Sequence, residues 1–167
     1  MKLKYVVVIL IIVVLGIGGY CFVKYKEKNK TEEVDLSTSN IKSFYLTYTN
    51  GYMINSYTRY QLSLEDDKYN IEIKPYGIDE EDKLNIEVTT EFIEELSKIL
   101  KKYAVNKWDG FDKTNQGVLD GDSFSFSMSF NNGKSIHATG YMKWPSNYHL
   151  FESDISTLFM DIYNKNT

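Results

Sequence analysis

The sequence predicts an α+β domain, in which an antiparallel sheet of about six strands carries two helices on one face, preceded by one transmembrane helix. Three observations lead to this prediction. Residues 5–23 form an uncharged apolar run, several later segments alternate polar and apolar residues, and two more segments carry the helical spacing of apolar residues. The expected order after the transmembrane helix is β-β-β-β-α-β-β-α.

Residues 5–23 are predicted to anchor the chain in a membrane. In a helix they reach roughly 29 Å at about 1.5 Å per residue, which is about the thickness of one hydrocarbon core. The run exceeds the apolar region of about 7–15 residues that a cleaved signal peptide uses, so we expect an uncleaved signal anchor. Two alternatives stay open: a cleaved and secreted form, and lipidation of Cys21, which Tyr20 disfavours because a small residue usually precedes a lipidated cysteine.

The folded domain is expected outside the cell membrane. The stub at residues 1–4 is short, and a short stub before a lone first span normally stays in the cytoplasm. Lysine counts argue the other way, since two lysines precede the span and four follow it closely. A polar, aperiodic stalk over residues 24–42 is expected to join the anchor to an extracytoplasmic domain over residues 43–167.

Charge and cysteine content exclude several classes of partner. Residues 1–30 contain six lysines and one glutamate, a net charge of +5, so the total of −4 leaves −4 − 5 = −9 on residues 31–167. An acidic domain is a poor match for nucleic acid, and no nucleic-acid partner is expected. The only cysteine lies in the apolar run, which leaves the domain without a disulfide or thiol chemistry. No cofactor is expected.

Periodicity places the first strands and both helices. Strict alternation of apolar and polar residues predicts strands over 44–49, 59–64, 69–73 and 84–88. Apolar residues with helical spacing predict helices over 90–103 and 148–163. The first helix also has glutamates near its start and lysines near its end, which matches the helix dipole.

A hairpin is predicted between the two helices. Residues 123–130 alternate serine with phenylalanine or methionine, and residues 134–142 follow after a short loop. A three-residue loop pairs Phe124 with Gly140, so that large side chains face small ones, whereas a two-residue loop would mix the two faces. Gly133 is expected to take the left-handed conformation that such a loop requires.

The polar side of this hairpin is the main candidate site. The register places Ser127 opposite His137, and a serine beside a histidine can act as nucleophile and base if a carboxylate, such as Asp120 or Asp122, orients the ring. The centre of a strand lacks the exposed elbow and oxyanion donors of such enzymes, so we expect recognition there. Trp108 and Trp144 could extend this surface as a platform on which a ligand stacks. Tryptophans beside turns more often close a core. The predicted recognition surface is Ser125, Ser127, His137, Thr139, Tyr141, Trp108 and Trp144.

Two acidic patterns suggest alternative sites, one for calcium and one for glycoside hydrolysis. The loop at 109–122 resembles a calcium loop from Asp112 onward, but Ser123 stands where a bidentate glutamate is needed. The carboxylate runs at 65–67 and 79–82 could supply the paired acids of a glycoside hydrolase. The distance between two such carboxyl groups decides whether they can act as that pair. We expect plain turns at these places and no metal site.

Three further segments carry a resemblance to a family. They read W-x-G-F at 108–111, D-G-x-x-F at 120–124 and G-Y-x-x-x-P at 140–145. This run resembles the uncharacterised small membrane-anchored or lipoprotein domains of low-GC Gram-positive bacteria, over about residues 105–160. The resemblance implies a fold and a membrane address, and it implies no catalytic residue.

Three functional hypotheses follow from these patterns. The first is non-enzymatic recognition of a protein or cell-wall component by a domain tethered through residues 5–23. The second is a cell-envelope hydrolase that uses acidic or Ser/His groups. The third is a small inhibitor or immunity-type protein, which should expose an apolar patch of several hundred Å². The chain is expected not to be an enzyme.

Overall fold

Seven strands and two α-helices build the part of the chain that the computed structural model describes, residues 34–51 and 57–167. The predicted stub and the anchor at 5–23 lie outside these residues, as does most of the predicted stalk. Among the described residues, no helix combines the length and the apolar character needed to cross a bilayer.

The elements agree closely with the predicted periodicities. The strands are β1 (Ile41–Thr49), β2 (Tyr57–Glu65), β3 (Lys68–Lys74), β4 (Leu84–Val88), β5 (Phe111–Thr114), β6 (Ser123–Phe130) and β7 (Ser135–Tyr141). The helices are α2 (Thr90–Lys102) and α3 (Tyr148–Asn166), and short 3-10 turns lie at η1 (Thr38–Asn40), η2 (Glu80–Asp82) and η3 (Val105–Trp108).

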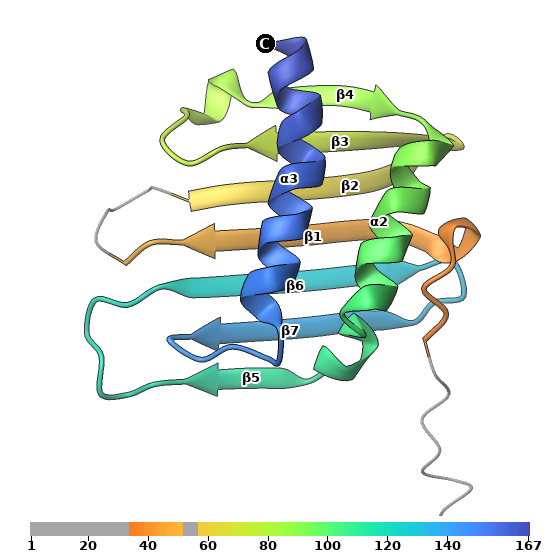
Figure 1. Ribbon diagram of the computed structural model, residues 1–167. Helices are drawn as coiled ribbons and strands as arrows, with labels where there is room; N and C mark the ends of the chain where they lie inside the picture. The colour runs from red at the N-terminus through yellow and green to blue at the C-terminus, as the bar shows by residue number, and fades with distance from the viewer. Residues whose placement is uncertain (1–33, 52–56) are drawn as a thin grey trace, which may run out of the picture. The chain divides into compact units, whose positions relative to one another are not determined.

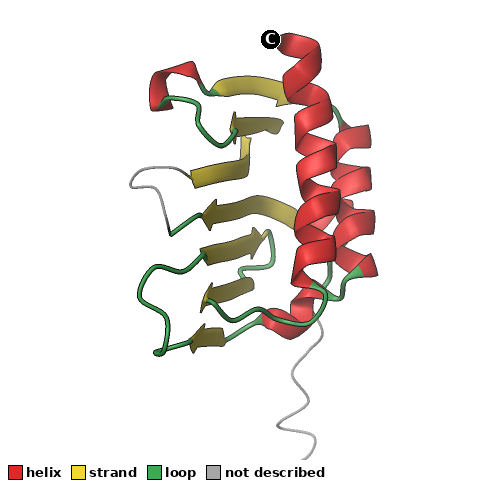
Figure 2. Cartoon of the chain, turned by 60° about the vertical axis from the view of Figure 1, so that its left-hand side comes forward, coloured by secondary structure: helices red, strands yellow, loops and turns green. Residues whose placement is uncertain are grey.

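The strands form one sheet in the order β4-β3-β2-β1-β6-β7-β5. Figure 1 shows α2 and α3 crossing this sheet, and Figure 2, turned from that view, shows both helices on the same side of it. The α+β class and the placement of both helices on one face are therefore confirmed.

The prediction of an antiparallel six-stranded sheet was wrong in one respect. A seventh strand, β5, lies within the segment 109–122 that was expected to be a loop, and it pairs with β7 in parallel, which makes the sheet mixed. Periodicity could not reveal β5, because the strand has four residues and only Phe111 among them is apolar. Its backbone is held by the edge of β7, a partner that is distant in sequence.

The β6–β7 hairpin has the predicted register. Phe124 lies opposite Gly140 and Met128 opposite Ile136, while Gly133 has a φ of +80°. The Gly133 N–H donates to the carbonyl of Phe130 at 3.0 Å and closes the turn. The alternation of large and small residues therefore fixes this hairpin as the sequence analysis expected.

Apolar side chains of all layers meet between the sheet and the helices. Phe159 of α3 lies at the centre, with its ring 5.8 Å from Phe44, 5.0 Å from Tyr60 and 5.1 Å from Phe92, measured between centroids. These three partners come from β1, β2 and α2. One aromatic side chain thus joins both helices to the middle of the sheet.

The folded unit begins earlier than the predicted boundary at residue 43. It starts at Val34, and Leu36 is only 6% exposed. The Ser97 hydroxyl of α2 donates to the Leu36 carbonyl at 2.6 Å, and Ile41 is fully buried. The prediction of a stalk over residues 34–42 rests on their many polar residues, among which Leu36 and Ile41 form no periodic pattern.

Replacing Gly140 with alanine should destabilise the domain. A Cβ atom at this position would lie against the Lys143 carbonyl oxygen and the Phe124 ring, closer than Cβ atoms approach in proteins. We expect Gly140→Ala to lower the free energy of unfolding by about 2 kcal/mol or more. Urea denaturation followed by tryptophan fluorescence measures this loss.

The matched control is Ser135→Ala at the exposed start of the same strand, for which we expect a change within about 0.5 kcal/mol. Equal stability of Gly140→Ala and the wild type would contradict the packing described here.

Candidate functional site

The face of the sheet opposite α2 and α3, here called the open face, is the candidate site. It exists because each strand sends alternate side chains to opposite sides, and the helices cover only the apolar side. Along β6 the phenylalanines and Met128 are buried, while the four serines between them are half-buried on the open face.

The centre of the open face carries uncharged polar side chains, here called the hydroxyl field. Four positions on each of β1, β6 and β7 form it, and the cross-strand register aligns them in rows. Neighbouring strands lie about 4.8 Å apart and alternate residues about 6.8 Å apart, so the field measures roughly 10 Å by 20 Å. Its members are Ser43, Tyr45, Thr47, Thr49, Ser123, Ser125, Ser127, Ser129, Ser135, His137, Thr139 and Tyr141.

Five of the seven predicted recognition residues lie together in this field. Ser127 is in register with Tyr45 on one side and with His137 on the other. Ser125 and Thr139 form the neighbouring row, and His137 and Thr139 are exposed. The structure thus assembles the serine, threonine and histidine positions into one surface.

The two tryptophans of the predicted surface lie on the other side of the sheet. Trp108 is 4% exposed and packs edge-on against Phe126 and Phe151, at centroid distances of 5.6 and 4.8 Å. Trp144 is half-buried and stacks on Tyr148 at 4.9 Å. Both therefore close the core beside the helices, and neither joins the hydroxyl field.

Tyr141 supports the surface from its edge. Its hydroxyl accepts a hydrogen bond from the Gly121 N–H at 2.8 Å and donates to the Leu119 carbonyl at 2.8 Å. These two bonds fix the loop between β5 and β6 at the border of the field. Sequence patterns alone did not separate this bracing role from a contact role.

The carboxylates near Ser127 and His137 are engaged elsewhere. Asp122 accepts from the Tyr48 hydroxyl and, at 3.3 Å, from the Gly51 N–H. Asp109 accepts from the backbone N–H of His137 at 3.0 Å. A Ser-His-Asp arrangement needs a carboxylate on the ring itself, and these contacts favour recognition over nucleophilic catalysis.

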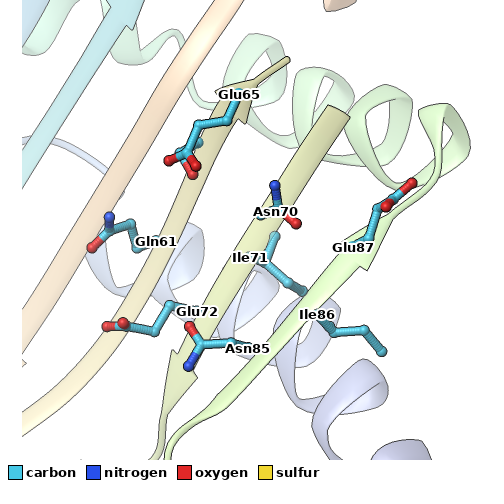
Figure 3. A pocket seen from close by; sticks show the side chains of 9 residues that line it. Gln61, Glu65, Asn70, Ile71, Glu72, Asn85, Ile86 and Glu87 are labelled. Carbon is cyan, nitrogen blue, oxygen red and sulfur yellow. The ribbon is translucent and has the colours of Figure 1, made fainter. Parts of the chain in front are cut away.

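The other half of the open face, over β2, β3 and β4, is charged. It contains a hollow of about 390 Å³, and Figure 3 shows the polar side chains that stand around it. Its lining consists of Gln61, Ser63, Glu65, Asn70, Ile71, Glu72, Asn85, Ile86 and Glu87. Within residues 34–51 and 57–167, no group of three or more His, Cys, Asp or Glu side chains is arranged to hold a metal ion.

Ion pairs neutralise two carboxylates of this charged half, Glu72 and Glu80. Arg59 contacts both Glu72 and Glu80, and the Lys83 ammonium lies 2.8 Å from Glu72 and 3.0 Å from Glu80. Hydrogen bonds from Arg59, Tyr57 and Lys83 lower the pKa of Glu80 to about 2. Carboxylates bound to cations in this way do not suit proton donation near neutral pH.

The prediction of a plain turn at residues 79–82 did not include this network. Arg59 is the only arginine of the chain, and its forked guanidinium can bind two carboxylates at once. The network attaches the β3–β4 connection to β2 and so shapes the border of the hollow.

A third group of polar side chains lies on the helix side, beneath the start of α3. The Tyr148 hydroxyl is buried and has no hydrogen-bond partner in the described part of the chain, and desolvation raises its pKa. One turn later, burial raises the pKa of Glu152, while His149 lowers it. Burial raises the pKa of Tyr48 and of Tyr60, and the Glu152 charge adds a smaller contribution to each.

Fold and site together define a two-layer α+β domain that leaves one face of a mixed sheet open. The chain matches no family model, and comparisons with curated proteins and with solved structures give no match either. The resemblance to small membrane-anchored domains of Gram-positive bacteria stays a prediction.

Loss of Arg59 should destabilise the domain. The guanidinium and Glu72 are 15% and 17% exposed, so Arg59→Gln leaves two carboxylates to share Lys83 in a partly desolvated place. We expect the free energy of unfolding to fall by about 1–2 kcal/mol, with partial recovery in Arg59→Lys.

Urea denaturation measures this effect, and Lys68→Gln is the matched control. Lys68 and Glu87 pair at 2.9 Å with both side chains mostly in solvent, so this change should cost no more than about 0.5 kcal/mol. Arg59→Gln and Lys68→Gln with the same stability would refute the role of the network.

Glu152→Gln should stabilise the protein at neutral pH. The pKa of Glu152 is raised in the folded state, so folding favours its protonated form, and stability falls as the pH rises above the ordinary value of 4.5. The glutamine removes this penalty and should flatten the pH dependence of the thermal midpoint.

Thermal unfolding of both proteins at pH 4.5 and at neutral pH tests this, with Glu94→Gln on the exposed face of α2 as the control. A thermal midpoint of Glu152→Gln below that of the wild type at neutral pH would show that the ionised carboxylate stabilises the fold.

Proposed function

We propose that the protein is a membrane-anchored recognition domain that works outside the cell membrane, and that its open face binds a protein or a component of the cell envelope. The anchor in this proposal is the apolar run at residues 5–23, and the polar residues after it hold the folded unit away from the lipid. The domain acts by binding and carries out no reaction.

The observation that carries the proposal is the composition of the hydroxyl field. Tyrosine, serine and other small polar residues supply adaptable hydrogen bonds and contact area in binding surfaces such as antibody loops. Here they cover three adjacent strands, which hold them on a rigid support. A folded domain that needed this face only for solubility would be expected to use charged residues there.

Two alternative functions have less support. A hydrolase would need free acidic or Ser/His groups, but Glu72, Glu80, Asp109 and Asp122 are bound to cations, backbone or tyrosine. An inhibitor or immunity-type protein would expose a broad apolar patch. The large apolar side chains exposed among the described residues come from three separate segments: Tyr76, Leu119 and Leu150.

The proposal predicts binding of the full-length protein to envelope fragments through the open face. Ser127→Glu places a charge at the centre of the hydroxyl field and should weaken co-sedimentation with envelope fragments at least tenfold, about 1.4 kcal/mol. His137→Glu, at an exposed position of the same row, should do the same without a burial cost.

The matched control is Ser153→Glu on the exposed surface of α3, which should bind like the wild type. Protease added to intact cells tests the placement, since residues 34–167 should be digested while the anchor is retained. Envelope binding that all three glutamate variants preserve would refute the role of the open face, and full protection from protease would refute the outside placement.

A further inference from the structure

The hydroxyl field excludes charge although the domain around it is strongly acidic. None of its members is Asp, Glu, Lys or Arg, whereas residues 31–167 together carry a net charge of −9. Among the described residues, charged side chains stand at its borders, where Arg59 is in register beside Thr47 and Asp112 is in register beside Thr139. The field therefore suits a ligand without charge.

Hydroxyl groups dominate the hydrogen-bonding capacity of this surface. Each Ser, Thr or Tyr hydroxyl can both donate and accept, so it can match a partner hydroxyl in either direction. Some pair across the sheet, as Ser43 and Ser129 do at 2.6 Å between their oxygens. The Thr139 hydroxyl donates to the Asp112 carboxylate at 2.9 Å. Ser135 and His137 are exposed, and there a ligand with many hydroxyls can replace water.

Tyr45 adds an apolar surface on β1, the strand of the field that borders β2. It lies in the row Gln61–Tyr45–Ser127–His137, and its side chain is half-buried. A tyrosine ring can pack against the C–H face of a sugar while the hydroxyls around it bind the sugar's edge. The field thus combines a flat ring with a border of donors and acceptors.

Other classes of ligand fit this surface less well. Protein interfaces have an apolar core with several aromatic and arginine anchors. The field has no arginine and no aliphatic side chain apart from threonine methyl groups, and of its two tyrosines, Tyr141 braces a loop through its hydroxyl. Nucleic acids and anionic polymers require lysine or arginine side chains for their phosphates. An uncharged, extended and hydroxyl-rich molecule remains.

We propose that the hydroxyl field binds an uncharged polysaccharide of the cell envelope, a proposal that rests on the recognition function argued above. The chain of sugars lies across β1, β6 and β7, with one ring against Tyr45 and its hydroxyls bonded to Ser127 and His137. Binding makes no ion pair, so its affinity changes little with salt.

Selective destruction of the ligand tests this proposal with the full-length protein in a detergent that has no sugar headgroup. Envelope fragments are treated with periodate, which cleaves vicinal diols of sugars, or with protease. We expect periodate to reduce binding at least tenfold, and we expect protease treatment and raised salt to change it less than twofold. Cellulose oligosaccharides, whose sugars carry the vicinal diols that periodate cleaves, serve as a defined uncharged competitor and should displace the protein.

Variants of Tyr45 link the effect to the field. Tyr45→Ala should lose binding at least tenfold, Tyr45→Phe should stay within threefold of the wild type because the ring remains, and Ser153→Glu should be unchanged. Circular dichroism and thermal unfolding establish that each variant is folded.

The outcomes separate this inference from the proposed function. Binding that depends on the open face but disappears with protease and survives periodate identifies a protein partner, which overturns the polysaccharide and leaves the recognition function standing. Binding that falls steeply with salt identifies an anionic polymer and overturns it equally. Envelope binding that is the same in Ser127→Glu and the wild type removes both proposals.

Discussion

The strict alternation of side chains along β6 is the constraint on which the rest of the structure depends. Phe124, Phe126, Met128 and Phe130 all lie on the helix side, and β6 pairs with β1 on one edge and β7 on the other. A slip of one residue in either pairing would turn four large apolar side chains to the open face. Because such a slip would expose the core, the same alternation also fixes where every serine of the hydroxyl field stands.

Polar interactions divide the open face into two halves with different chemistry. On β2 to β4, carboxylates and cations neutralise one another, and the Arg59 network draws the β3–β4 connection against β2. The twelve members of the hydroxyl field on β1, β6 and β7 include no Asp, Glu, Lys or Arg, so the hydrogen bonds of this surface are made among polar side chains, with water or with a ligand. The ion pairs of the first half contribute to stability, while the second half is the surface to which we assign the proposed recognition.

Much of this arrangement could be predicted from residue periodicity. Regular alternation identified β1 to β4 and the β6–β7 hairpin, and the helical spacing of apolar residues identified α2 and α3, because each of these elements buries one side. The position of Ser127 beside His137 followed from the size match of Phe124 and Gly140. In these cases local sequence and tertiary packing impose the same pattern.

Features that depend on a distant partner could not be predicted in this way. The four residues of β5 are held by the edge of β7. The side of the sheet on which Trp108 and Trp144 lie depends on the path of η3 and of the β7–α3 connection. Arg59 bonds to Glu80, which is 21 positions away in the sequence. Such contacts depend on the topology of the chain, and residue periodicity does not reveal them. The burial of Leu36 and Ile41 could not be predicted, because their polar neighbours leave no periodic pattern of apolar residues.

The pairing of β1 with β6 brings together segments that are far apart in the chain, since Ser43 and Ser129 are separated by 86 positions. The strands β1 to β4 form a local meander and β6 to β7 a local hairpin, so each unit can assemble through short loops. Joining them requires closure of a long loop. This closure lowers the conformational entropy of the chain before the contacts between β1 and β6 can form and offset the loss. This seam is therefore the step that should set the folding rate, and until it closes the Phe-rich edge of the hairpin is open to pairing with another chain.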